Sequence, residues 1–81
     1  MHIDKKRVAD VLEAIGTLLE LTGENPFRCI AYYNAARAID ALPDDLHARV
    51  TAGTLTDIRG VGEAIAEKIT ELVTTGRLAY Y

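Results

Sequence analysis

The sequence predicts an all-α fold, a compact bundle of four to five short helices. Apolar residues recur at the three- and four-residue intervals of helices along most of the chain. No segment alternates apolar and polar residues for long enough to form a strand. The chain has 81 residues, of which 49% are hydrophobic, and this size suits one small core. We therefore expect residues 1–81 to form a single domain.

The first predicted helix begins after Asp4 and ends at Gly23. An aspartate at this position accepts hydrogen bonds from unpaired backbone N–H groups of the first turn, and glycine adopts the left-handed conformation that ends a helix. The apolar face of this helix consists of Val8, Val11, Leu12, Ile15, Leu18 and Leu19. Their spacing predicts an amphipathic helix that packs against the core.

The second predicted helix begins at Asn25-Pro26, a capping side chain followed by a proline at the first helical position, and it stops before Pro43. Its predicted inner face is rich in alanine, which lets a neighbouring helix approach closely. That face consists of Phe27, Ile30, Ala31, Ala35, Ala38, Ile39 and Leu42. We expect the nearby Cys29 to be a small buried hydrophobic residue.

The rest of the chain predicts three shorter elements. A short helix over 44–52 has Leu46 and Val50 inward and closes at Gly53, and a brief turn follows over 54–58 with Leu55 and Ile58 inward. A last helix follows Gly62 and ends at Thr75-Gly76. Its predicted inner face consists of Ala64, Ile65, Ile69, Leu72 and Val73.

Charge and cysteine content exclude several functions. The formal net charge is −3, which argues against a basic coat for nucleic acid or a polybasic membrane anchor. One cysteine cannot form an internal disulfide, and with only two histidines beside it there is no set of ligands for structural zinc. No apolar run is long enough for a membrane span or a signal peptide. We expect a cytoplasmic monomer without a membrane partner.

The segment Arg59-Gly60-Val61-Gly62 carries the most information about function. Two glycines around one apolar residue allow a tight turn, and Val61 is expected to hold that turn to the core. The amides near Gly60 and Gly62 would then lie at the N-terminus of the last helix, where unpaired donors and the helix dipole attract anions. The alternative is that these glycines form only a tight connection between two helices.

This stretch resembles a helix-hairpin-helix motif over residues 54–76, and the whole chain resembles the amino-terminal domain of X-family DNA polymerases. Several separated segments carry the resemblance, in the same order. They are Gly23-Glu24-Asn25-Pro26-Phe27-Arg28, Ala31-Tyr32-Tyr33-Asn34-Ala35-Ala36-Arg37, Leu42-Pro43, the hairpin, Ala66-Glu67-Lys68-Ile69 and Thr75-Gly76-Arg77-Leu78. The sequence departs from the family at Arg59, where a proline usually stands, and this arginine would place a cation beside the phosphate site.

The resemblance implies a domain that holds the 5′-phosphate side of a gap or nick in DNA. A polymerase domain farther along the chain would fill the gap during base-excision repair, and its Mg2+ would lie outside this domain. No cofactor is implied within residues 1–81 except a Na+ or K+ ion at the hairpin. By position, the backbone carbonyls of Thr56, Ile58 and Val61 would hold that ion.

The resemblance also assigns residues to DNA contacts. Arg28 stands where the family has a phosphate-binding lysine, Tyr32 matches a family tyrosine, and Phe27 replaces a histidine that stacks on a base. Stacking on an unpaired base is one hypothesis for Phe27 and Tyr32. The alternative for Tyr32 is a ring that packs on a neighbouring helix.

Lys68 matches the Schiff-base lysine with which relatives remove a 5′-deoxyribose phosphate. Such a lysine must be partly neutral near pH 7, which requires desolvation or neighbouring cations. Ala64 and Tyr80 occupy positions that are lysine in lyase-active relatives. Lys68 is therefore either a catalytic lysine or a surface lysine paired with Glu71. A module for protein–protein contact or self-association remains the alternative to DNA binding for the whole domain.

Overall fold

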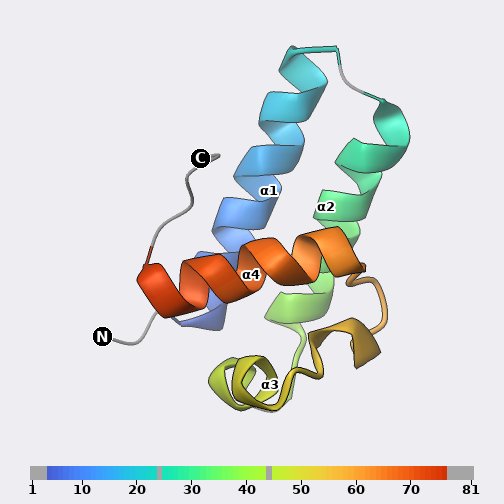
Figure 1. Cartoon of the computed structure of the whole chain (residues 1–81). Helices are drawn as coiled ribbons and strands as arrows, with labels where there is room; N and C mark the ends of the chain where they lie inside the picture. The colour runs from blue at the N-terminus through green and yellow to red at the C-terminus, as the bar shows by residue number, and fades with distance from the viewer. Residues whose placement is uncertain (1–3, 24, 44, 77–81) are drawn as a thin grey trace.

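Four α-helices and one 3-10 turn form the fold in the computed structural model, which describes residues 4–23, 25–43 and 45–76 (Figure 1). The elements are α1 (Lys5–Leu21), α2 (Pro26–Asp40), α3 (Leu46–Ala52), the 3-10 turn η1 (Leu55–Asp57) and α4 (Glu63–Thr75). These described residues include no strand. The predicted all-α fold is confirmed.

Side-chain caps begin the first three helices. Asp4 accepts a hydrogen bond from the backbone N–H of Arg7 at 2.8 Å, and Asn25 accepts one from Phe27 at 2.8 Å. Asp45 caps α3, which begins at Leu46, two residues later than the predicted start at 44. Positive φ angles at the predicted glycines end three helices: 76° at Gly23, 70° at Gly53 and 79° at Gly76. Local chemistry therefore sets these boundaries, as expected.

Helices α1 and α2 lie side by side as an antiparallel pair, and α4 crosses both on one face (Figure 1). The pair is closely packed where the ring of Tyr33 lies over Gly16. A Cβ atom at Gly16 would lie only 3.0 Å from Cε1 of that ring, so glycine makes room for the tyrosine. The Tyr33 hydroxyl donates a hydrogen bond to the Glu20 carboxylate and lies 3.2 Å from the hydroxyl of Thr17.

The core lies between this helix pair and α4. Its most deeply buried large side chains are Val8, Leu12, Ile15, Ile39 and Ile69. The predicted inner face of α1 is confirmed except at Leu18, which is exposed. Leu46, Leu55 and Ile58 are buried as predicted, whereas Val50 is partly buried.

The prediction for α2 is wrong at its first turns. Phe27 and Ile30 are 80% and 51% exposed, whereas Cys29, Tyr32 and Ala36 are buried. Alanines on several sides of this helix left its inner side ambiguous, and the packing against α1 decides it. Burial of Cys29 agrees with the prediction. Ala64, also predicted to face inward, is exposed.

Tyr33 provides a test of the α1–α2 contact by pH. The hydrogen bond that Tyr33 donates to Glu20 raises the pKa of the tyrosine above its ordinary value of 10.0. Because the folded pKa is raised, this contribution to stability is present below pH 10 and is lost as the pH rises through the folded pKa. Absorbance titration near 295 nm, with Tyr33→Phe subtracted, is expected to show the shift, and Glu20→Gln should reduce it. An unchanged titration curve in Glu20→Gln would contradict the contact.

Candidate nucleic-acid interface

A single reverse turn connects η1 to α4. The backbone N–H of Val61 donates to the carbonyl of Ile58 at 3.0 Å, and Gly60, the third residue of the turn, has a φ of 96°. In a type II turn, the third residue has a positive φ and the second residue does not. Gly60 has a positive φ and Arg59 does not, so the four residues from Ile58 to Val61 form a type II turn. A Cβ atom at Gly60 would meet the backbone oxygen of Asn34 at 3.5 Å and Cβ of Ala38 at 3.7 Å. Both distances are ordinary contacts, so it is the positive φ of Gly60 that favours glycine here.

Apolar side chains hold this turn to the core. Val61 is 6% exposed, and Ile58 and Leu55 on the preceding segment are buried as well. The predicted anchoring role of Val61 is confirmed. Since the side chains point inward, the polar backbone of the turn is left at the surface.

The N-terminus of α4 is open to a ligand. Gly62 is its N-cap residue and provides no side-chain cap for the first-turn N–H groups, and the first intrahelical bond runs from Ala66 N–H to Gly62 O at 2.8 Å. The amides of Glu63, Ala64 and Ile65 precede that bond and lie at the positive end of the helix dipole. A Cβ atom at Gly62 would meet nothing within 4 Å. The fold therefore has space for a larger residue at Gly62, and no side chain at this position caps the amides.

A cavity of about 290 Å³ lies between the hairpin and α2. It is lined by Arg28, Ala31, Tyr32, Gly60, Gly62, Glu63, Ala64 and Ile65. Segments about 30 positions apart therefore meet at one surface, which we call the hairpin cavity. Four residues predicted for DNA binding line it: Arg28, Tyr32, Gly60 and Gly62.

The structure distinguishes the two aromatic residues predicted to stack on bases. Phe27 is 80% exposed at the start of α2, next to Arg28, and its ring is accessible. Tyr32 is only 4% exposed and lies in the wall of the hairpin cavity. The burial of Tyr32 agrees with the alternative that its ring packs on a neighbouring helix, and its stacking on a base stays a prediction.

Two further residues matter for the chemistry of this surface. Glu63, which sequence reasoning missed, is the first residue of α4 and lines both the hairpin cavity and a neighbouring hollow; its place directly after the second glycine was the available signal. Arg59 is exposed on the turn.

Lys68 is partly exposed on α4 and is not among the residues that line the cavity. Tyr80 and Arg77 lie outside the described residues.

Of the carbonyls expected to hold a monovalent ion, those of Ile58 and Val61 lie on this turn and that of Thr56 lies on η1 before it. The Ile58 carbonyl accepts the N–H of Val61 and keeps a second lone pair, so it is compatible with an additional cation ligand. Thr56 is exposed on η1. Among the described residues, no group of three or more His, Cys, Asp or Glu side chains could hold a metal ion.

Arg59→Pro is expected to stabilise the fold and weaken DNA binding at once. Position two of a type II turn favours proline, and Ile58 before it already has the extended φ and ψ of −74° and 122° that proline requires. In the described part of the chain, the Arg59 N–H donates no backbone hydrogen bond. We expect a gain of about 0.4–1 kcal/mol in denaturant unfolding. Arg59→Gln, the control, should weaken binding equally without the gain; destabilisation by proline would contradict the turn assignment.

A glycine turn that is buried at Val61 and open at the following helix N-terminus is characteristic of helix-hairpin-helix proteins. Comparison with protein families agrees: a model described as a helix-hairpin-helix domain matches residues 3–78, and the chain belongs to this family. Domains of this class commonly bind DNA without sequence specificity. No curated protein and no solved structure matches the chain. Within the described residues, no helix is both long and apolar enough to cross a membrane.

Proposed function

We propose that the hairpin cavity binds the DNA backbone at gaps or nicks and holds the 5′-phosphate. The observation that supports this function is the meeting of Arg28 with the uncapped N-terminus of α4 across one small cavity. A phosphate there would accept hydrogen bonds from backbone amides and from a guanidinium group at the same time. Neither group reads base edges, so the contact is independent of sequence.

The charges of the domain predict weak DNA binding that depends on a few local groups. The chain has a net charge of −3, so the domain as a whole repels DNA, and Glu63, which lines the hairpin cavity, adds a negative charge near a bound phosphate. Attraction comes from Arg28, Arg59 and the amides of the first turn of α4. If the domain contacts two to four phosphates, DNA binding should weaken as salt is added. A plot of log Kd against the logarithm of the salt concentration should then have a slope of about 2–4.

We also propose that the domain serves an X-family DNA polymerase in repair synthesis. This proposal is supported by the ordered motifs on both sides of the hairpin, including Asn25-Pro26, which caps α2, and Thr75-Gly76, which ends α4. A Na+ or K+ ion on the carbonyls of Thr56, Ile58 and Val61 would bridge the turn to a phosphate. Replacing K+ by tetramethylammonium at equal ionic strength should then weaken binding.

The decisive experiment measures fluorescence anisotropy on gapped DNA with and without a 5′-phosphate, over a series of salt concentrations. We expect tighter binding of the phosphorylated DNA and the salt slope given above. Equal affinity for both DNAs would overturn the role of the 5′-phosphate. Absence of binding to either DNA, together with self-association in sedimentation, would favour the alternative of a protein-interaction module.

Borohydride trapping on DNA with a 5′-deoxyribose phosphate tests the separate lyase hypothesis for Lys68. A Schiff-base lysine needs neighbouring cations or desolvation. Of the described residues that line the hairpin cavity, one is a cation, Arg28, and one is a carboxylate, Glu63, while Ala64 stands where lyase-active relatives have lysine. We expect no covalent adduct that depends on Lys68. An adduct that disappears in Lys68→Ala but persists in Lys5→Ala would overturn this expectation.

A further inference from the structure

Asn34 is an exposed polar residue of α2 that lies next to the hairpin turn. A Cβ atom at Gly60 would lie 3.5 Å from the backbone oxygen of Asn34, so the turn and this point of the helix are in contact. Gly60 is exposed as well. Asn34 therefore belongs to the surface at which the function proposed above places DNA.

The fold gives no reason for an asparagine at this position. Position 34 lies in the middle of α2, where asparagine is less favourable than alanine because its side chain competes for backbone hydrogen bonds. In the part of the chain that the structure describes, the Asn34 side chain forms no hydrogen bond. The two N–H donors of its carboxamide are therefore available to a ligand.

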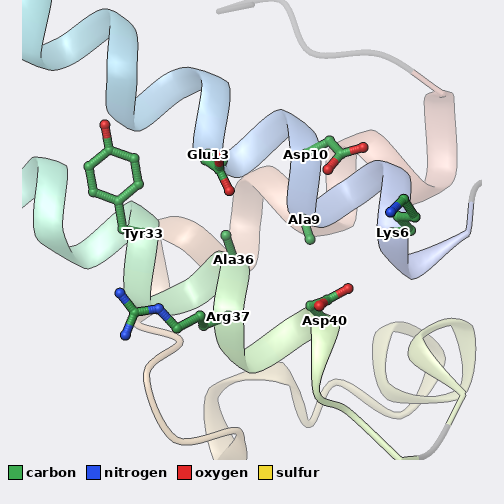
Figure 2. A pocket seen from close by; sticks show the side chains of 8 residues that line it. All are labelled: Lys6, Ala9, Asp10, Glu13, Tyr33, Ala36, Arg37 and Asp40. Carbon is green, nitrogen blue, oxygen red and sulfur yellow. The ribbon is translucent and has the colours of Figure 1, made fainter.

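The side of α2 that faces α1 does not use Asn34. Figure 2 shows the hollow between the two helices, which α2 lines with Tyr33, Ala36, Arg37 and Asp40. Of the described residues that line this hollow, three are acidic and two are basic. Such a surface offers a phosphate little attraction, and Asn34 is not part of it.

Helix geometry relates Asn34 to the hairpin cavity. Ala31 lines that cavity, three residues after Arg28 and three residues before Asn34. Three residues of helix fall about 60° short of a full turn, so Arg28 and Asn34 lie on either side of Ala31. Along the helix axis they are about 9 Å apart. A strand that contacts Arg28 and continues along α2 would therefore pass Asn34.

This spacing fits one strand of DNA. A strand carries one phosphate for about every 3.4 Å of duplex axis, so the separation of about 9 Å corresponds to about two or three nucleotides. Asparagine side chains are among the groups with which proteins contact DNA phosphates. We propose that the Asn34 amide donates a hydrogen bond to a phosphate about two or three nucleotides from the 5′-phosphate. This contact rests on the function proposed for the hairpin cavity.

Asn34→Ala is the first test, with anisotropy on gapped DNA that carries a 5′-phosphate. We expect affinity to fall about threefold to tenfold, because one hydrogen bond is lost. The salt slope should stay the same, because asparagine has no charge. The melting temperature should rise by about 2–4 °C, since alanine favours the helix. A loss of affinity accompanied by a lower melting temperature would indicate a structural role and overturn the proposal.

Thr74→Ala is the matched control. Thr74 is also an exposed, uncharged polar residue of a helix, and it lies about 18 Å along α4 from Gly62. Its replacement should leave DNA affinity unchanged. An equal loss of affinity in both variants would contradict a local contact at Asn34.

DNA with a neutral methylphosphonate in place of one phosphate identifies the group that Asn34 contacts. At about two or three nucleotides from the 5′-phosphate, this change should weaken binding of the unaltered chain more than binding of Asn34→Ala, because both changes remove the same hydrogen bond. The same change far from the gap should affect both chains equally. Losses that simply add at the nearer position would overturn the proposed contact.

The results also separate the role of Asn34 from the function on which it rests. If the chain prefers DNA with a 5′-phosphate and Asn34→Ala binds that DNA equally well, only the role of Asn34 is overturned. If the chain does not distinguish DNA with and without the 5′-phosphate, the function proposed for the hairpin cavity fails, and the contact of Asn34 fails with it.

Discussion

Gly62→Asp is expected to weaken binding of gapped DNA by about tenfold to a hundredfold, because hydrogen bonds to a charged group are lost and a negative charge is added. An aspartate at the N-cap of α4 would accept the first-turn amides itself. The fold should tolerate the change, since a Cβ atom at Gly62 meets nothing within 4 Å and its φ and ψ of −85° and 173° suit any residue. Stability should stay the same or rise by a few tenths of a kcal/mol.

Gly62→Asn is the matched control, because asparagine caps the helix as well as aspartate does but has no charge. The difference in DNA affinity between the two variants measures the repulsion of a phosphate at this point. Anisotropy gives the affinities and urea unfolding gives the stabilities. Unchanged DNA affinity in a stable, folded Gly62→Asp variant would place the phosphate site elsewhere and contradict the function proposed for the hairpin cavity.

Helix boundaries could be predicted because each depends on one or two residues. Asp4 and Asn25 cap α1 and α2 with their own side chains, and Gly53 and Gly76 end α3 and α4 in the left-handed conformation. The turn at Gly60 could be predicted for the same reason, because its positive φ strongly favours one residue type, glycine. Such features depend little on distant parts of the chain.

Features that depend on distant contacts were harder to predict. The inner side of α2 depends on its packing against α1, which includes the close contact between Tyr33 and Gly16, and Phe27 is exposed. The hairpin cavity joins Arg28 to Gly62 across 34 positions of sequence. The resemblance to a known family suggested that both residues contact DNA, but only the structure shows them, together with Glu63, around one cavity.

Ile69→Ala is expected to cause the largest loss of stability. Ile69 is fully buried on α4, where it holds the helix that presents the hairpin amides against the α1–α2 pair. Removing its outer carbons leaves a void and costs about 2–5 kcal/mol. For a domain of this size, that loss corresponds to a melting temperature lower by about 10–30 °C. Thermal unfolding followed by circular dichroism measures the change.

Leu21→Ala is the matched control for Ile69→Ala, since Leu21 is 78% exposed and loses a similar volume without leaving a void. Its effect on stability should stay within about 0.5 kcal/mol. Well below its melting temperature, Ile69→Ala should still bind gapped DNA, because the amides of α4 and Arg28 are unchanged. A stable Ile69→Ala variant would show that α4 is not held by this core. Loss of DNA binding in a variant that is still folded would show that small shifts of α4 disrupt the hairpin cavity, so the two measurements separate the stability of the fold from the geometry of the site.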